Sequence, residues 1–311
     1  MPAGKRRALL ALSILCLIWG YNWVMMKEAL RFAAPFDFVA LRALASALLL
    51  FLAMAVRRTP LVPQAPLAYL FLGLTQTTGF LGLSTWALVE GGAGKTAVLV
   101  FTMPFWTLLL AWPALGERMH GRQWAAVLLA LLGLVLVLEP WNLSTPLKSK
   151  LLAVGAGISW AVSNVFAKWL RQRRSLDLLP LTAWQMLFGS LVLIAVAAVV
   201  PGRAMIWTPY FGWIMAYTAL LGTVAGWLLW LYVLNHLTAG TASLSLLAVP
   251  VIGLVSSHLQ LGEVPGSSEL AGALLIGAAI LMLAGIAAQQ GTAADSDRPL
   301  IPRPGRTPPA A

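Results

Sequence analysis

Long apolar runs recur along almost the whole chain and constrain its fold more than any other feature. Each run is close to the roughly 20 residues that a helix needs to cross the hydrocarbon core of a bilayer. The connections between the runs are too short to hold a folded soluble domain. We predict ten spans, over residues 8–26, 36–56, 66–89, 94–115, 122–138, 150–169, 179–200, 210–234, 241–261 and 268–288.

The composition agrees with this assignment. Hydrophobic residues make up 60% of the chain and charged residues 10%, whereas a soluble domain carries about 25% charged residues. The chain therefore lacks the polar surface that would coat a water-soluble globule. Alternating segments of about ten residues, which are typical of membrane β-barrels, do not occur. The sequence predicts an all-α integral membrane protein with ten transmembrane helices.

Residues 82–117 are followed by a second copy of the same pattern at a fixed distance. A shift of 146 positions, without a gap, places them on residues 228–263. Such a regular offset indicates an internal duplication, with a first half over residues 8–140 and a second half over 149–288. The tail at 289–311 is rich in Pro, Gly, Asp and Arg, and we expect it to be disordered. The shared residues are Leu83/Leu229, Leu88/Leu234, Ala93/Ala239, Gly94/Gly240, Pro104/Pro250, Leu108/Leu254, Leu115/Leu261, Gly116/Gly262 and Glu117/Glu263.

The distribution of Lys and Arg predicts the orientation. With the N-terminus in the cytoplasm, the cytoplasmic segments carry 14 of these residues and the outer segments carry six. Cytoplasmic loops are enriched in positive charge, so we expect both termini inside. The net charge of +11 then reflects membrane topology, and we expect no nucleic-acid partner. Because each half has an odd number of spans, the second half is inverted, an arrangement that lets one fold open to either side.

Short motifs are spread over residues 8–288. They are Trp19-Gly20-Tyr21-Asn22, Pro35 with Arg42, Leu115-Gly116-Glu117-Arg118, Ser159-Trp160-Ala161 with Ala167-Lys168, and Pro250 with Leu261-Gly262-Glu263. In this order, the set resembles the ten-helix EamA group of the drug/metabolite transporter superfamily, with two inverted five-helix repeats. The resemblance implies alternating-access export or exchange of small metabolites, most of all amino acids, aromatic or otherwise neutral, across a bacterial inner membrane. It also implies a central cavity lined mainly by spans one, three, four, six, eight and nine.

Polar side chains inside a span are costly and tend to face the bundle interior or a water-filled path. That rule selects Asn22, Gln76, Ser163, Asn164 and His258. An amide both donates and accepts hydrogen bonds, so Asn22 and Asn164 suit a zwitterionic substrate. The alternative for all of them is hydrogen bonding between helices, which is common in membrane bundles.

Aromatic residues supply a second group of candidates for substrate binding. Phe80 lies one turn from Gln76 and shares its face, and Trp227 and Trp230 lie three residues apart. An aromatic wall suits an apolar or aromatic substrate, whereas the alternative is contact with lipid. The aromatic candidates are Trp19, Phe80, Phe101, Trp160, Tyr217 and Trp230.

Five further residues are candidates for gating or structural roles. Pro104 and Pro250 lack an amide proton, so they are expected to kink spans four and nine, either as hinges or as simple curvature. Glu117 and Glu263 end equivalent helices and are expected to act as structural caps or gate latches. Arg42 is the one charge deep in a span. It either neutralises a substrate carboxylate or pairs with the backbone end of a neighbouring helix.

The sequence contains no enzymatic, metal-binding or cofactor motif, and we expect none of these activities. No acidic residue lies near mid-membrane, and His258 is near a span end. A proton relay usually needs such a group, so we hypothesise facilitated transport without obligatory proton coupling. The alternatives are an exporter of neutral drugs or nucleosides, a membrane-embedded enzyme and a pore. The expected partners are a small-molecule substrate and the lipid bilayer, and a monomer is sufficient for such a carrier.

Overall fold

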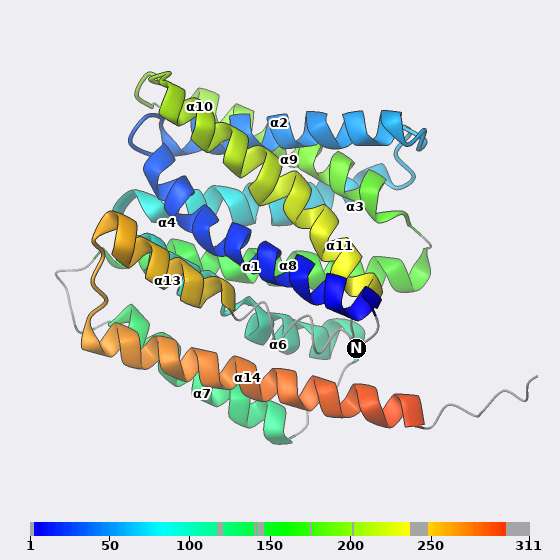
Figure 1. Cartoon of the computed structure of the whole chain (residues 1–311), viewed down its shortest axis with the longest axis vertical. Helices are drawn as coiled ribbons and strands as arrows, with labels where there is room; N and C mark the ends of the chain where they lie inside the picture. Colours follow the sequence, from blue (N-terminus) through cyan, green and yellow to red (C-terminus); the bar gives the residue numbers. More distant parts are fainter. Residues whose placement is uncertain are drawn as a thin grey trace, which may run out of the picture.

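The computed structural model describes residues 3–116, 121–139, 141, 146–174, 176–200, 202–236 and 248–296, and these residues form helices without any strand. The helices lie along one direction and form a bundle (Figure 1). Several rods consist of consecutive helical segments joined end to end. This arrangement is the all-helical membrane fold that the apolar runs predict.

The first half contributes five rods to the described residues. The third and fourth are compound, and each changes its helical geometry or direction part-way along. The rods are α1 (Ala3–Ala29), α2 (Pro35–Val56), α3–η1–α4 (Pro66–Leu72, Gly73–Gly82 and Leu83–Glu90), α5–α6 (Ala93–Val100 and Met103–Leu115) and α7 (Gly121–Leu138).

The second half repeats this order. Its rods are α8 (Leu147–Arg173), α9 (Leu178–Val199), α10–η2–α11 (Pro209–Ala216, Tyr217–Ala225 and Gly226–His236), α13 (Ala248–Leu261) and α14 (Ser267–Ser296). Residues 241–247 of the ninth predicted span lie outside the described residues, as does 297–311 of the tail. The helix α14 continues to Ser296, past the predicted end of its span at residue 288, so the first part of the expected tail is helical.

Length and composition identify seven of the described helical stretches as able to cross a membrane. Two shorter apolar helices, Ala248–Leu261 and Ser267–Leu283, follow them in the chain. The remaining rod, α3–η1–α4, is as long as its neighbours but carries more polar residues in its middle, where Thr75, Gln76 and Thr77 fall together. Gln76 and Thr77 line the central cavity described below, so part of the polarity of this rod faces the interior of the bundle.

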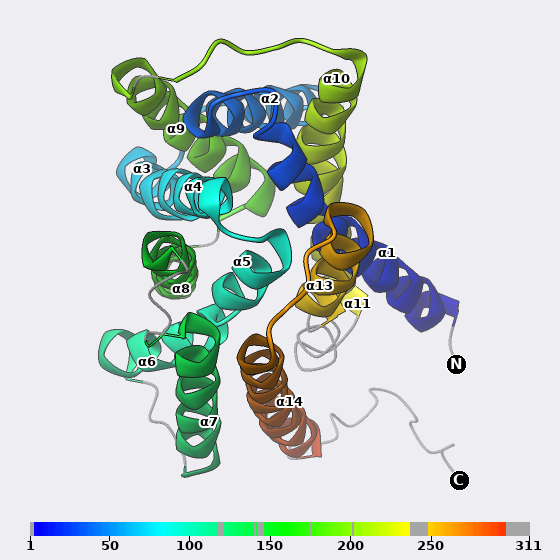
Figure 2. The ribbon, with the colours of Figure 1, turned by 90° about the vertical axis from the view of Figure 1, so that its left-hand side faces the viewer.

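Several pairs of helices that pack between the two halves have an equivalent pair, in which each helix is replaced by its counterpart from the other half. The helix α2 packs against η2 and α9 packs against η1, while α1 packs against α13 and α8 packs against α6. Two further pairs, α2 with α9 and α7 with α14, join equivalent helices of the two halves. Figure 2 shows α7 and α14 together at one edge of the bundle, so these last helices of each half do not reach its centre.

Two π-helical segments, η1 and η2, occupy corresponding positions in the two halves. A shift of 146 positions carries Thr77 in η1 onto Thr223 in η2. A π-helix has a wider turn than an α-helix and is frequently found at functional sites. Both segments lie in the centre of their rods, so each half presents a locally widened helix to the other.

Kinks are expected at Pro104 and Pro250, and the structure describes the chain on both sides of Pro104. The chain leaves helical geometry at Phe101 and Thr102, and Pro104 lies in the first turn of the new helix α6. Pro250 lies near the start of α13 as described, and the residues before Ala248 lie outside the described residues. The backbone N–H groups in the first turn of a helix have no acceptor within the helix, so a proline, which lacks this group, is tolerated there. Span four is therefore broken rather than bent, and Phe101 occupies the break.

Candidate functional site

A central cavity opens between the two halves. Its volume is about 720 Å³, including its open mouth. Eight of the ten rods contribute to its wall, and α7 and α14 do not. The lining residues discussed below are Trp19, Asn22, Arg42, Gln76, Thr77, Phe80, Phe101, Trp160, Gln185, Gly222, Thr223 and Trp227.

Aromatic rings form much of this wall, and they meet across the boundary between the halves. Phe80 of η1 stacks on Trp160 of α8, with ring centroids 4.6 Å apart. Phe101 meets the same indole edge-on at 6.0 Å. On another part of the wall, Trp19 of α1 meets Trp227 of α11 edge-on at 6.1 Å. Each pair takes one ring from each half, so a relative movement of the halves changes the shape of the aromatic wall.

The polar part of the wall contains buried groups without a protein partner. Arg42 is 3% exposed, and its Nη2 donates to Thr223 Oγ1 at 3.3 Å. Its Nε and Nη1, the Oδ1 of Asn22 and the Oε1 of Gln185 have no hydrogen-bond partner among the described residues. Buried polar atoms are normally hydrogen-bonded, so this cluster is suited to a polar ligand. Arg42 is the one charged residue among the described residues that line the cavity.

The structure brings together six of the ten binding residues that the sequence selects. The predicted binding residues in the cavity wall are Trp19, Asn22, Gln76, Phe80, Phe101 and Trp160, together with Arg42 from the gating group. These residues lie on five different rods of the chain. Of the five polar residues that the interior rule selects, Asn22 and Gln76 line this wall.

Four predicted binding residues lie elsewhere. Ser163 donates to the Trp160 carbonyl of its own helix at 2.9 Å. Asn164 lies in a separate crevice beside Pro104, where its Nδ2 donates to Met103 Sδ at 3.2 Å. Tyr217 donates from its hydroxyl to the Ile18 carbonyl at 2.9 Å. Trp230 packs on Trp19, with centroids 6.4 Å apart, behind the cavity wall.

Other wall residues were not selected from the sequence. Gln185 lies on α9, and the resemblance to the family does not place spans two and seven in the wall. The sequence does contain a signal that could have identified Gln185. A shift of 143 positions aligns α2 with α9 over their whole length and places Arg42 on Gln185. Two polar residues at equivalent depths in two apolar helices mark a common interior position.

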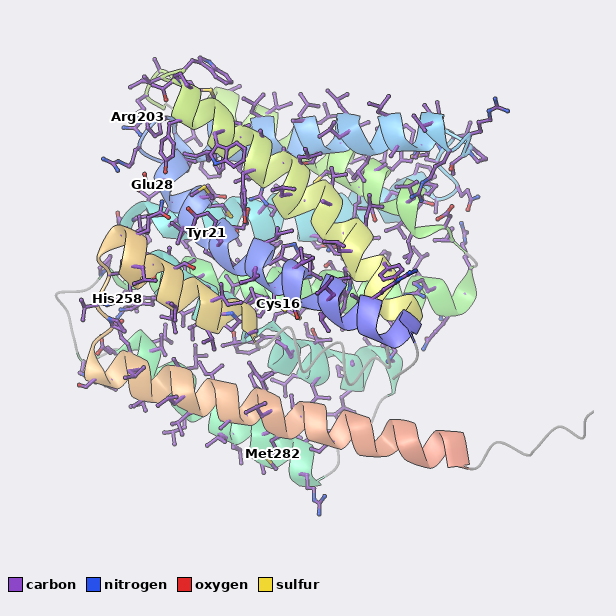
Figure 3. The ribbon with its side chains drawn as sticks, in the orientation of Figure 1. Cys16, Tyr21, Glu28, Arg203, His258 and Met282 are labelled. Carbon is purple, nitrogen blue, oxygen red and sulfur yellow. The ribbon has the colours of Figure 1, made fainter. Side chains whose placement is uncertain are left out.

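The end of the bundle away from the N-terminus, on the left in Figures 1 and 3, is held together by polar contacts. The Glu263 carboxylate accepts hydrogen bonds from the backbone N–H groups of Ala93 at 2.8 Å and Gly94 at 3.2 Å. Lys27 donates to the carbonyls of Leu88 at 2.6 Å and Gly91 at 2.9 Å. An anion at a helix start and a cation at a helix end both complement the helix dipole.

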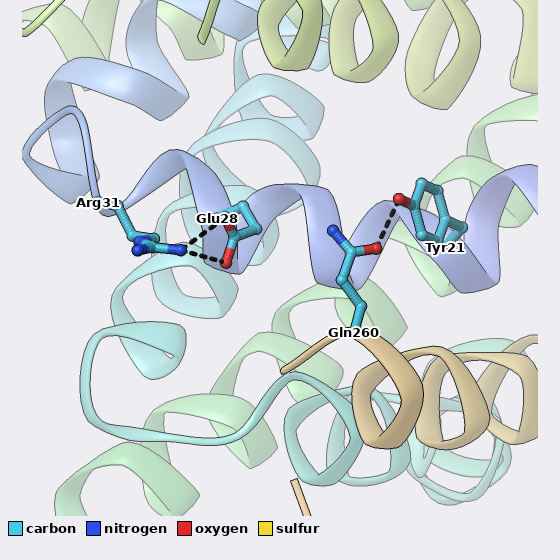
Figure 4. A network of polar contacts seen from close by, with 4 residues as sticks. All are labelled: Tyr21, Glu28, Arg31 and Gln260. Atoms are coloured by element: carbon cyan, nitrogen blue, oxygen red, sulfur yellow. Dashed lines mark hydrogen bonds and ion pairs between the residues drawn. The ribbon is translucent and has the colours of Figure 1, made fainter. Parts of the chain in front are cut away.

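These contacts of Glu263 are the ones that a structural cap would make, which is one of the two roles predicted for it. Its equivalent, Glu117, lies outside the described residues. His258, near the same end, has its Nδ1 3.0 Å from the Glu263 carbonyl oxygen. Tyr21 donates to Gln260 Oε1 at 2.6 Å, which ties α1 to α13 (Figure 4), and Glu28 pairs with Arg31 on α1 at 3.2 Å.

The model of the EamA-like transporter family matches the chain twice, over residues 6–139 and 147–285. The chain belongs to the EamA-like transporter family. This EamA-like transporter is 31% identical to an uncharacterized transporter, YoaV, of Bacillus subtilis, over 89% of its own chain and 96% of that protein. It is 29% identical to a probable amino-acid metabolite efflux pump of Salmonella typhimurium, over 88% and 92%.

Two further similarities are more distant. A probable terminal-alkyne amino-acid exporter of Streptantibioticus cattleyicolor is 27% identical over 68% of this transporter and 70% of that protein. A solved crystal structure superimposes with a TM-score of 0.64 at 15% identity, covering 92% of this chain and 99% of the other. That similarity supports the fold. The family and the apolar helices together establish a multi-pass membrane transporter.

Proposed function

We propose that this transporter exports or exchanges small metabolites, most of all neutral or aromatic amino acids, by alternating access. The observation that carries the proposal is the central cavity, in which aromatic rings surround a small group of buried polar atoms. Binding sites of carriers built from inverted repeats lie near the bilayer midplane, at the interface of the repeats. The names of two relatives, an amino-acid metabolite efflux pump and an amino-acid exporter, agree with this substrate class.

The arrangement of the halves supports alternating access. Each aromatic pair of the wall joins the two halves, and so does the cap between Glu263 and α5. When one half rocks against the other, the contacts at one end of the bundle separate while the cavity itself stays in place. We infer that both termini face the cytoplasm of a bacterium, that the capped end is the outer gate, and that the inner membrane is the site of transport.

We also infer that transport follows the substrate gradient without obligatory proton coupling. Proton relays in membranes usually employ a carboxylate or a histidine inside the bilayer. The described wall of the cavity contains amides, hydroxyls, aromatic rings and one guanidinium. A guanidinium stays protonated in proteins and does not exchange a proton with its ligand.

Counterflow in liposomes tests the function directly. Purified protein is reconstituted, the vesicles are loaded with an unlabelled amino acid, and uptake of the labelled compound is followed for a panel of amino acids. Saturable exchange of one or a few compounds is expected without a pH gradient. Exchange of nucleosides or neutral drugs alone would show that the proposed substrate class is wrong. A strict requirement for a pH gradient would contradict transport without proton coupling. Flux that does not saturate with substrate would indicate a pore.

A further inference from the structure

The guanidinium of Arg42 is buried in the wall of the cavity with most of its donors unused. The side chain is 3% exposed, and it forms no ion pair with another described residue. Thr223 Oγ1 accepts a single hydrogen bond from Nη2, at 3.3 Å, while Nε and Nη1 have no partner among the described residues. An arginine offers five N–H donors in a planar fork, so the donors of Nε and Nη1 are left without an acceptor among the described residues.

Such a group is costly to keep in a membrane-embedded wall for structural reasons alone. A buried charge normally needs an opposite charge and hydrogen bonds to balance the loss of water. The structural alternative, a pairing of Arg42 with the carbonyl end of a neighbouring helix, is not found among the described contacts. The planar fork instead matches a carboxylate, whose two oxygens accept parallel hydrogen bonds from it.

A hydrogen-bond acceptor, Asn22 Oδ1, approaches the same glycine as this cation. A Cβ built on Gly222 would lie 3.6 Å from Arg42 Nη2 and in still closer contact with Asn22 Oδ1, so both atoms converge on the same glycine. The Oδ1 of Asn22 has no partner in the described structure. An amide oxygen next to a guanidinium can accept from an ammonium group while the guanidinium binds the adjacent carboxylate, as an α-amino acid requires.

The two halves differ at this position, which gives the cavity a polarity. In the first half, Arg42 contacts Thr223 of η2. In the second half, Gln185 takes the equivalent place on α9, where its main-chain carbonyl accepts from Thr77 of η1 at 3.4 Å and its side-chain Oε1 has no partner among the described residues. One half thus supplies a cation where the other supplies a neutral amide. A substrate with a single negative group is held in one orientation, with its carboxylate on the α2 side.

We propose that Arg42 is the specificity-determining residue of the cavity and binds the carboxylate of the transported molecule, with Asn22 accepting from its ammonium group. This inference rests on the proposed function, because it assigns the chemistry of the same cavity. It narrows the substrates to compounds with a free carboxylate beside an apolar or aromatic group. Amines, amides and uncharged drugs are poor substrates on this account.

Paired ligands that differ in the carboxylate test the assignment. Binding of L-phenylalanine and of L-phenylalaninamide to the purified protein is measured by ligand-dependent thermal stabilisation, together with phenylacetate and phenylacetamide. The wild-type protein is expected to prefer each acid over its amide by about 30-fold or more, as for a buried charge pair. Arg42→Gln, which copies the equivalent residue Gln185, is expected to remove this preference, and Arg42→Lys to retain part of it.

Arg31→Gln is the matched control, because it removes an exposed guanidinium at the end of the bundle, and it is expected to keep the preference. An unchanged preference in Arg42→Gln, or equal binding of acid and amide by the wild type, would overturn the assignment. So would a folded wild-type protein that binds none of the four compounds. If phenylacetate binding depends on Arg42 while no amino acid exchanges in liposomes, the carboxylate site stands and the amino-acid function fails. If amino acids exchange in liposomes but Arg42→Gln keeps the preference for acids, the amino-acid function stands and the carboxylate site fails.

Discussion

The carboxylate of Glu263 lies 2.8 Å from the backbone nitrogen of Ala93, although the two residues are 170 positions apart. Glu263 ends the Leu-Gly-Glu motif of the second half, while Ala93 begins α5 in the first half. Residues 82–117 and 228–263 are the two copies of the duplicated stretch. Glu263, at the end of the second copy, thus caps α5, which begins inside the first copy. A single duplicated motif supplies both the helix start and the group that satisfies it.

Removal of this cap is expected to destabilise the protein. Glu263→Ala leaves the N–H groups of Ala93 and Gly94 without their acceptor, and loss of an N-terminal cap costs about 1 kcal/mol. For a chain of this size the melting temperature should fall by about 2 °C. Thermal unfolding in detergent measures it. Glu90→Ala, at an exposed position nearby, is the control, and an equal effect of both substitutions would contradict the capping role.

The two asparagines that the sequence treats alike are expected to differ. Asn22 lines the central cavity and Asn164 lies in a separate crevice. Asn22→Ala removes an unpaired acceptor from the cavity and should raise the KM for amino-acid exchange about tenfold, because one hydrogen bond to a charged group is lost. Asn164→Ala should leave it within about twofold. Counterflow rates at several substrate concentrations, at matched expression, decide between them, and the opposite ranking would place the site in the crevice.

Gly222 is expected to tolerate no side chain. A methyl group there would clash with Asn22 Oδ1 and lie in ordinary van der Waals contact with Arg42 Nη2, at 3.6 Å, so Gly222→Ala displaces the amide of Asn22. Overpacking of this kind costs 1–3 kcal/mol, and exchange should fall about tenfold. Gly212 belongs to the same rod but faces open space, so Gly212→Ala is the control for the helical backbone. Full activity of Gly222→Ala would show that this contact is not part of the site.

The aromatic stack is expected to select among substrates. Trp160 stacks on Phe80 and meets Phe101 edge-on. A Trp160→Leu substitution keeps an apolar wall but removes ring-to-ring contact with a bound aromatic side chain, which contributes about 1 kcal/mol. Exchange of phenylalanine should weaken roughly fivefold relative to that of alanine or threonine. Competition between the labelled and unlabelled amino acids measures this ratio, and an unchanged ratio would remove Trp160 from side-chain recognition.

Local chemistry was sufficient to predict the fold and part of the cavity. Apolar runs of about 20 residues must form helices in a bilayer, and the predicted spans agree with the observed rods within a few residues except where α1, α8 and α14 extend further. The fixed offset of the duplicated stretch likewise predicts two related halves, and the odd number of spans in each half predicts that they are inverted. Asn22, Gln76 and Arg42 could be placed in the interior because a polar group inside an apolar run has few other places to point.

Packing decided the rest. Ser163 and Asn164 are neighbours in the sequence, and consecutive residues on a helix point about 100° apart. The sequence therefore does not tell which of the two faces the cavity. In the structure, neither residue lines it. The sequence also does not distinguish Trp227 from Trp230. In the structure, Trp227 lines the cavity and Trp230 packs on Trp19. Residues from distant parts of the chain, such as Arg42 and Thr223, meet through the docking of one half on the other. The sequence by itself determined the helices and their polar positions, whereas the tertiary structure alone decided which faces meet, because helix rotation depends on contacts summed over the whole bundle.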